Sequence, residues 1–200
     1  MTGQERRQQL LDVGRKLFAE RGFEGTSIEE IAAQAGVSKP VVYEHFGGKE
    51  GLYAVVVDRE VEHLTSFAMT LLEGPHTQPK FEAATASLLH YIEENADGFR
   101  ILVRDSPVAQ STGTFASLIN DIATQVEDIL GHEFKSRGYD PKLAPMYAQM
   151  LVGMVALTGQ WWLDVRKPGK AEVVAHLVNL AWHGLEGMER RPQLVSRRKN

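Results

Sequence analysis

A predicted corner of two short helices, between residues 26 and 46, constrains the fold more than any other segment. Its sequence is TSIEEIAAQAGVSKPVVYEHF. Ser27 is an N-cap residue and Glu30 follows three positions later, which is the spacing of a capping box. Gly36 stands at the turn, where a residue without Cβ tolerates a positive φ. Ser38 is expected to cap the next helix, and Pro40 falls in its first turn, where the missing N–H costs no hydrogen bond. The pattern predicts a helix-turn-helix.

Helical periodicity continues along the whole chain, and the alternation typical of strands is missing. We predict an all-α fold in which an N-terminal three-helix helix-turn-helix domain, residues 1–48, is joined by a long helix to a larger C-terminal helical domain, residues 49–189. The basic segment 190–200 is predicted to be a disordered tail. Helices are expected at residues 4–21, 27–35, 38–45, 49–73, 80–95, 97–105, 114–137, 142–167 and 171–189.

Composition restricts the class of protein. The chain is 43% hydrophobic and 24% charged and contains no cysteine, so a globular protein without disulfides or thiolate metal sites is expected. No apolar run reaches the length of about 18 residues that a membrane span requires. The first residues lack the basic and apolar regions of a secretory signal. These features favour a cytoplasmic location.

The charge distribution limits any DNA contact to a local patch on an otherwise acidic protein. The net charge is −4, and residues 1–50 hold seven basic and eight acidic residues. Affinity for DNA depends on the phosphates that are neutralised locally rather than on the total charge. In the second short helix, Val42 and Phe46 are expected to point inward, which leaves an outer face of Lys39, Val41, Tyr43 and His45. A short helix with small or basic side chains near its N-terminus suits entry into the major groove.

The segment AGVSKPVVYEHFGGKEGLY resembles the recognition segment of the TetR family of bacterial repressors, and the match extends from about Arg7 to Tyr53. Members are all-helical homodimers with an N-terminal DNA-binding domain and a C-terminal domain that dimerises and holds a small-molecule inducer. The resemblance implies that Ser27 and the N-terminus of its helix meet a phosphate. Pro40 stands where the family often has glycine, and Glu44 is acidic at a position often near phosphates.

The same resemblance assigns roles to the second helix of the corner. Lys39, Pro40 and Val41 would lie against base edges, where Lys39 can reach guanine acceptors and the apolar pair can meet a thymine methyl. Tyr43, His45 and Lys49 would fix the register on the DNA backbone. The complete predicted DNA-binding set is Ser27, Ser38, Lys39, Pro40, Val41, Tyr43, His45 and Lys49.

Two C-terminal segments are unusually apolar. Residues 143–165 are too apolar around their circumference for a helix with a solvent face, and the segment 171–189 is similar. The helices near 142–167 and 171–189 therefore favour a homodimer in which each chain contributes this pair to a four-helix interface. Core packing without dimerisation is the alternative. A dimer would read a palindromic or near-palindromic operator.

An inducer site is implied by the family, and its effector is expected to be apolar. Candidate lining residues are Phe67, Leu71, Tyr91, Phe99, Leu102, Val103, Arg104, Trp161 and Trp162. For each aromatic or aliphatic candidate, ordinary core packing is the favoured alternative. Arg100 and Arg104 lie four apart beside Asp105 and suit either an anionic ligand or a surface ion pair.

Three hypotheses for function follow. The first is a ligand-responsive repressor that binds a palindromic operator as a homodimer and is released by a small-molecule inducer. The second is a DNA-binding architectural or protein-interaction factor with no small-molecule ligand. The third, a helical enzyme, has no catalytic constellation, P-loop or H-E-x-x-H motif to support it, and no metal or cofactor is expected. The basic residues of the tail fit either non-specific DNA attraction or a solvated segment.

Overall fold

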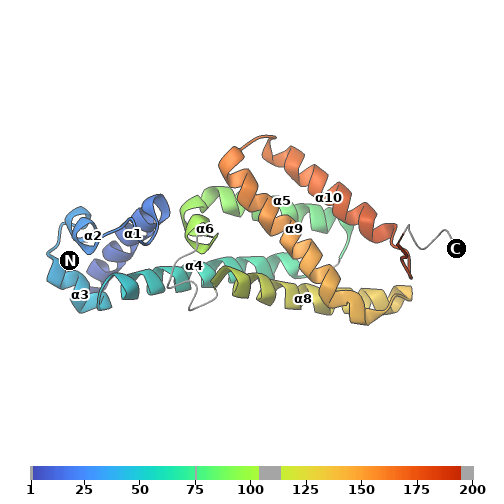
Figure 1. Ribbon diagram of the computed structural model, residues 1–200, viewed down its shortest axis with the longest axis horizontal. Coiled ribbons are helices and arrows are strands. Elements are labelled where there is room, and N and C mark those ends of the chain that lie inside the picture. Colours follow the sequence, from blue (N-terminus) through green and yellow to red (C-terminus); the bar gives the residue numbers. More distant parts are fainter. Residues whose placement is uncertain (1, 75, 104–113, 195–200) are drawn as a thin grey trace. The chain divides into compact units, whose positions relative to one another are not determined.

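A computed structural model describes residues 2–74, 76–103 and 114–194, and every regular element in these ranges is helical (Figure 1). The helices are α1 (Gly3–Arg21), α2 (Ile28–Gln34), α3 (Lys39–Phe46), α4 (Lys49–Leu72), α5 (Gln78–Glu94), α6 (Ala96–Val103), α8 (Thr114–Arg137), the 3₁₀ turn η1 (Pro141–Leu143), α9 (Ala144–Val165) and α10 (Lys170–Glu186). The all-α fold class is confirmed. None of the described helices is long and apolar enough to cross a membrane.

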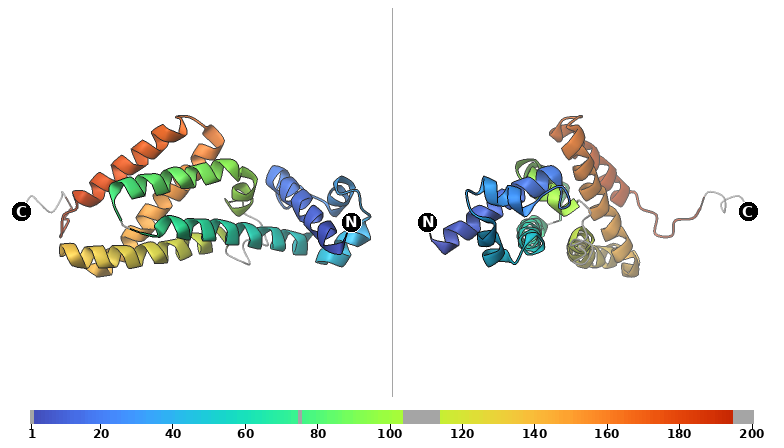
Figure 2. Two further views of the ribbon diagram at one scale, coloured as in Figure 1. Left: turned by 180° about the vertical axis from the view of Figure 1, so that it is seen from behind. Right: turned by 60° about the vertical axis from the view of Figure 1, so that its left-hand side comes forward.

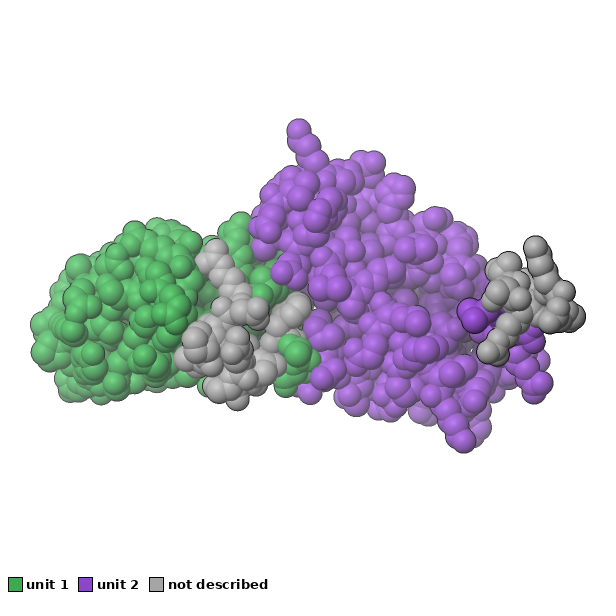
Figure 3. Space-filling model, in the orientation of Figure 1, with its two compact units in different colours: residues 1–67, 92–118 green, residues 68–91, 119–200 purple. Residues whose placement is uncertain are grey.

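The chain divides into two compact units, shown in Figure 3. Unit 1 contains residues 1–67 and 92–118, and unit 2 contains residues 68–91 and 119–200. Helices α4, α5 and α8 each contribute to both units. The helix-turn-helix therefore shares a compact unit with most of α4 and with α6. The predicted domain boundary after residue 48 stays a prediction.

The described residues of unit 1 include a hydrophobic core formed mainly by the first four helices. An aromatic cluster joins α1 to α4. The ring centroid of Tyr53 in α4 lies 4.9 Å from that of Phe18 in α1 and 5.0 Å from that of Phe23, which follows α1 in the chain. Gly14 lets α4 approach α1, because a Cβ there would lie 3.0 Å from Leu52 Cδ2. The buried members of this core are Leu10, Leu11, Leu17, Phe18, Ala19, Phe23, Ile28, Ile31, Ala32, Ala35, Val42, Leu52, Tyr53, Val56, Val57 and Ile101.

A buried ion pair lies where α1, α4 and α6 meet in unit 1. Arg15 Nε donates to Glu60 Oε1 at 2.5 Å, and Arg15 Nη2 donates to Glu60 Oε2 at 3.4 Å. The Glu60 side chain is 9% exposed. Gly98 of α6 covers the pair, since a Cβ on this residue would lie 2.5 Å from Glu60 Cδ. The absence of a side chain at residue 98 therefore gives the carboxylate its space.

Unit 2 contains α9 and α10, which diverge from the short connection between them in the views of Figures 1 and 2. The indole of Trp162 is buried against α10, and its N–H donates to the carbonyl of Pro168 at 3.0 Å. A second cluster joins α8 to α9 through Phe134 and Tyr147, whose rings meet edge to face at 5.3 Å. Sequence alone predicted burial of the segment 143–165 on more than one side.

Within one chain, α9 leaves one apolar face exposed. The exposed side chains are spaced four or seven residues apart and therefore share one face of the helix. They are Met146, Met150, Leu157, Trp161 and Val165, with exposed fractions of 45–61%. Leu180 of α10 is 65% exposed as well. We call these six residues the α9/α10 apolar face.

The first residue of the predicted disordered tail contacts α8, and the disorder of the segment 190–200 stays a prediction. The Tyr139 hydroxyl donates to the carbonyl of Met188 at 3.0 Å, and the Arg190 guanidinium donates to the carbonyl of Arg137 at 3.3 Å. Arg137 is the last residue of α8, whose terminal carbonyls lack helical partners and attract cations. Residues 195–200 lie outside the described part of the chain.

Candidate nucleic-acid interface

The first helix of the predicted corner begins as the sequence indicated. The Ser27 hydroxyl accepts from the backbone N–H of Glu30 at 3.2 Å, and the Ser27 N–H donates to the Glu30 carboxylate at 3.1 Å. This confirms the capping box of α2. The hydrogen bonds from the N–H and hydroxyl of Ser27 hold the pKa of Glu30 below its usual value. Thr26, which is buried, ties the preceding turn to α1 through the carbonyls of Leu17 and Gly22.

The turn and the second helix follow the predicted geometry, with one correction. Gly36 has a φ of 63°, as the turn requires. Ser38 occupies the N-cap of α3, but its side chain makes no cap hydrogen bond. A capping hydroxyl normally accepts from the N–H of the second or third helical residue. Pro40 has no N–H, and the N–H of Val41 is bonded to the Ser38 carbonyl at 3.1 Å. Ser38 therefore begins α3 without capping it through its side chain.

The outer surface of α3 is narrower than predicted. Ser38, Lys39, Pro40, Tyr43 and Glu44 are exposed, and Val42 is buried as expected. The other two positions predicted to face outward, Val41 and His45, are half-buried. They flank the inward stripe formed by Val42 and Phe46, and Val41 packs against the core of unit 1. The exposed surface is concentrated in the first turn of α3 and around Tyr43.

The cations of this surface have partners inside the protein. Lys39 Nζ donates to Glu29 Oε1 of α2 and lies 5.9 Å from the centre of the Tyr43 ring. The hydrogen bond to Glu29 raises the pKa of Lys39, and the hydrogen bond from Lys39 lowers the pKa of Glu29. Lys49 Nζ donates to the Phe23 carbonyl at 3.0 Å and lies 4.2 Å from the centre of the Phe23 ring.

Sequence reasoning did not find the residue that holds the end of α3. Arg7 of α1 donates to the carbonyl of His45 at 2.8 Å, and its guanidinium stacks 4.3 Å from the centre of the Phe46 ring. The His45 carbonyl belongs to the last turn of α3, where carbonyl groups lack helical partners. Arg7 thus fixes α3 against α1. Its partner is 38 residues away, so no local pattern indicated the contact.

Comparison with known proteins decides the family of this corner and of the helices that follow it. Residues 10–56 match the family model of the bacterial regulatory proteins of the tetR family. Residues 78–184 match the model of the tetracyclin repressor-like C-terminal domain, which is more than half of the chain. The chain belongs to the TetR family. This TetR-family protein is a DNA-binding transcriptional regulator, as the other members are.

Relatives match this regulator over most of its length. The HTH-type transcriptional activator FasR of Mycolicibacterium smegmatis is 31% identical over 185 residues, which cover 90% of this chain and 83% of FasR. A TetR-like transcriptional regulator from Rhodococcus sp. RHA1 has the same fold, with a TM-score of 0.71, 24% identity, and coverage of 92% of this chain and 97% of that chain. A TetR-family regulator from Streptomyces coelicolor has a TM-score of 0.68 and 27% identity, with coverage of 90% and 80%.

The residues predicted to line an inducer site belong to both units of this regulator. Unit 1 contains Phe67, Phe99, Leu102 and Val103, and unit 2 contains Leu71, Tyr91, Trp161 and Trp162. Tyr91, Phe99, Leu102 and Trp162 are buried, whereas Trp161 is 49% exposed and belongs to the α9/α10 apolar face. Arg100 lies 3.7 Å from Asp97 as a surface ion pair. Arg104 and Asp105 lie outside the described residues.

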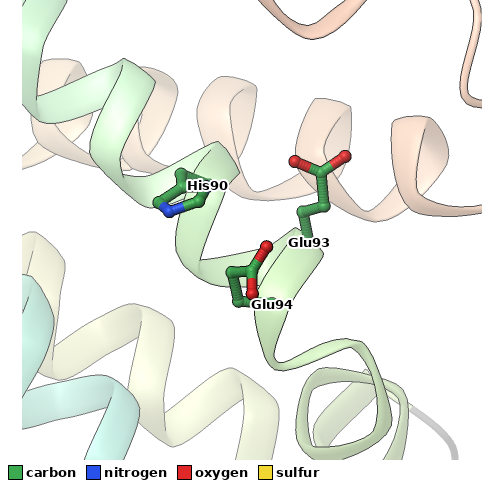
Figure 4. Close-up of side chains that lie close together, drawn as sticks. All are labelled: His90, Glu93 and Glu94. Carbon is green, nitrogen blue, oxygen red and sulfur yellow. The ribbon is translucent and has the colours of Figure 1, made fainter.

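One group of side chains within the described ranges could offer ligands to a metal ion, although no metal was expected from the sequence. His90, Glu93 and Glu94 lie one turn apart on α5, and their ligand atoms are within 4.8 Å of one another (Figure 4). The Lys170 ammonium lies 3.2 Å from His90 Nδ1. The contact with Lys170 therefore engages one of the two ring nitrogens that His90 could offer to a metal.

Proposed function

We propose that this regulator is a repressor that binds a palindromic operator as a homodimer and is released by an apolar small molecule. The observation that carries the proposal is the α9/α10 apolar face, which one chain leaves exposed beside well-packed cores. An exposed apolar surface of this kind is typical of an interface. A second copy of the chain, related by a twofold axis, would cover the same face on both partners.

The first turn of α3 is proposed to enter the major groove. Lys39 would donate to guanine, and the rings and methyls of Pro40 and Val41 would meet a thymine methyl. The exposed Ser38 hydroxyl, which makes no cap hydrogen bond, suits contact with a phosphate or a base. The N-terminus of α2 at Ser27 is proposed to meet a phosphate, since the first N–H groups of a helix attract anions.

Three further residues are proposed to fix the protein on the phosphate backbone. The Tyr43 hydroxyl is well suited because 48% of the residue surface is exposed. His45 is half-buried and would reach a phosphate only with the edge of its ring. Lys49 uses one of its three ammonium hydrogens on the Phe23 carbonyl, which leaves two for a phosphate. These contacts would fix register without reading sequence.

The DNA-binding proposal is tested by selecting a site from a library of randomised duplexes and measuring affinity by fluorescence anisotropy. A homodimer should select an inverted repeat and bind it with two chains per duplex, whereas one isolated half-site should bind far more weakly. Lys39→Ala should relax the sequence preference, and Tyr43→Phe should weaken binding to all sequences alike. An unchanged preference in Lys39→Ala would exclude base reading by Lys39.

The effector is tested separately. A small molecule that binds the folded protein must raise its melting temperature. It changes the affinity for DNA by the difference between its binding free energies for the DNA-binding conformation and for the released conformation. Compounds that raise the melting temperature are therefore retested in the anisotropy assay, where release of the operator is expected. Substitution of Phe99 or Trp162 should then weaken the response. If no apolar compound acts and the α9/α10 apolar face binds another protein, the architectural or protein-interaction function replaces this proposal.

The sign of regulation is measured with a reporter gene behind the selected operator. Repression predicts higher expression when the regulator is deleted or the effector is added. The relative from M. smegmatis is named as an activator, so lower expression on deletion would replace repression by activation and leave the DNA-binding proposal standing.

A further inference from the structure

Glu29 is an acidic residue on the surface that the proposed function turns toward DNA. It lies in the first turn of α2, its side chain is 63% exposed, and its carboxylate accepts a hydrogen bond from Lys39 at the start of α3. A carboxylate at this place repels phosphates, so its presence needs a reason beyond general attraction to DNA.

Helix formation accounts for Glu29 only in part: a carboxylate in the first turn of a helix is favoured, and Glu29 also accepts from its own backbone N–H. The capping box of α2 is completed by the next residue, Glu30, which bonds to the N–H and hydroxyl of Ser27. The ion pair itself adds little stability, because both Glu29 and Lys39 are about half exposed or more. The pair places the Glu29 carboxylate, which is a hydrogen-bond acceptor, beside the Lys39 ammonium group that is proposed to contact a base.

The chemistry of this pair matches one base pair. In the major groove, guanine presents the acceptors N7 and O6, and the paired cytosine presents its N4 amino group as the adjacent donor. An ammonium has donors only, and a carboxylate has acceptors only. Lys39 is therefore complementary to guanine, and Glu29 is complementary to cytosine. The neighbouring donor and acceptor of the protein match the neighbouring acceptors and donor of one G·C pair.

We propose that Glu29 is a specificity-determining residue that accepts from cytosine N4 while Lys39 donates to the guanine of the same pair. This inference rests on the proposed function of Lys39 as a base-reading residue. Glu29 then has two consequences for binding: it makes one G·C pair in each half-site necessary, and it lowers affinity for all DNA by its charge.

The decisive experiment uses the full-length protein and the duplex selected from the randomised library. In one half-site the cytosine is replaced by N4-methylcytosine, which still pairs with guanine but carries a methyl group in place of the hydrogen that faces the major groove. The proposal expects the unmodified protein to lose affinity by roughly fivefold to a hundredfold, the range of one specific base contact. Glu29→Ala should bind the modified and unmodified duplexes within about threefold of each other on the same scale.

Two variants separate base reading from charge. Glu29→Gln should shift the preference at this pair toward A·T, because glutamine bonds to adenine N6 and N7. Glu44→Gln removes a carboxylate from the exposed side of α3 without touching Lys39, so it should raise affinity for every duplex alike and keep the preference for G·C. If Glu29→Gln behaves like Glu44→Gln, Glu29 acts only through its charge and the proposal is overturned.

The failure of this inference and the failure of the proposed function give different results. Replacing the guanine by 7-deazaguanine removes the N7 acceptor and tests Lys39 alone. A penalty from 7-deazaguanine without one from N4-methylcytosine overturns the role of Glu29 and keeps that of Lys39. No penalty from either replacement, together with an unchanged preference in Lys39→Ala, overturns both. A selected operator without a G·C pair at the position that Lys39→Ala relaxes overturns the inference as well.

Discussion

Replacing Gly98 by alanine should separate the ion pair between α1 and α4. The new Cβ would lie 2.5 Å from Glu60 Cδ and 2.8 Å from Arg15 Nη2, which is closer than real Cβ atoms approach other heavy atoms. Gly98 is buried in α6, so the methyl group has no direction in which to escape. The Glu60 carboxylate must therefore move, and its 2.5 Å hydrogen bond with Arg15 Nε is lost.

The magnitude follows from two opposing effects. Breaking a fully buried ion pair costs about 3–5 kcal/mol. The Arg15 side chain is 33% exposed, so water partly solvates it after separation, and the lower end of about 3 kcal/mol applies. Alanine in place of glycine within a helix recovers about 1 kcal/mol. The net loss of unfolding free energy should be about 2 kcal/mol, or about 4–8 °C in melting temperature for a chain of this size.

The assay is urea denaturation followed by circular dichroism at one fixed protein concentration, because association would make stability depend on concentration. Gly131→Ala in α8 is the matched control. Its Cβ would meet Ala144 Cβ at 4.0 Å, an ordinary contact, so it should gain up to about 1 kcal/mol.

A double-mutant cycle isolates the collision with Glu60. In a Glu60→Ala background the carboxylate is gone, so the loss caused by Gly98→Ala should shrink by at least about 1 kcal/mol. An equal loss in both backgrounds would refute the reasoning, since the methyl group would then disturb something other than the ion pair.

Three other predictions concern the interface, the helix caps and acid. Leu157→Glu should prevent the proposed dimer from forming, so that light scattering gives the mass of a monomer, and should abolish operator binding, whereas Leu194→Glu, at a similarly exposed leucine outside the α9/α10 apolar face, should leave the mass of the particle unchanged. Ser27→Ala should cost about 1 kcal/mol in urea denaturation, whereas Ser38→Ala, whose hydroxyl caps nothing, should cost a few tenths at most. Because the folded state lowers the pKa of Glu30, its contribution to stability is present above the usual value of 4.5 and is lost as pH falls through the lowered pKa. The melting temperatures of the unmodified protein and Glu30→Gln should therefore differ above pH 4.5 and converge as the pH falls through the lowered pKa; a constant difference would contradict the assignment.

The sequence by itself determined the local structure of the DNA-binding corner. The Ser27–Glu30 capping box, the positive φ of Gly36 and the burial of Val42 each depend on residues within a few positions along the chain. Such relations are set by helix geometry, so a pattern of residue types is enough to predict them. The same holds for the helical fold class and for most helix ends, and the order of these local signals was specific enough to indicate the family.

Only the tertiary structure decided what the charged side chains of the corner contact. Arg7 holds the end of α3 from 38 positions away, Lys49 is bonded to the carbonyl of Phe23, and Lys39 is paired with Glu29 of the preceding helix. Each partner is brought close by the packing of one helix on another, and long flexible side chains have many possible partners that periodicity does not distinguish. Residue types therefore identified a surface that is proposed to bind DNA, whereas the packed helices decided which of its charges are already engaged within the protein.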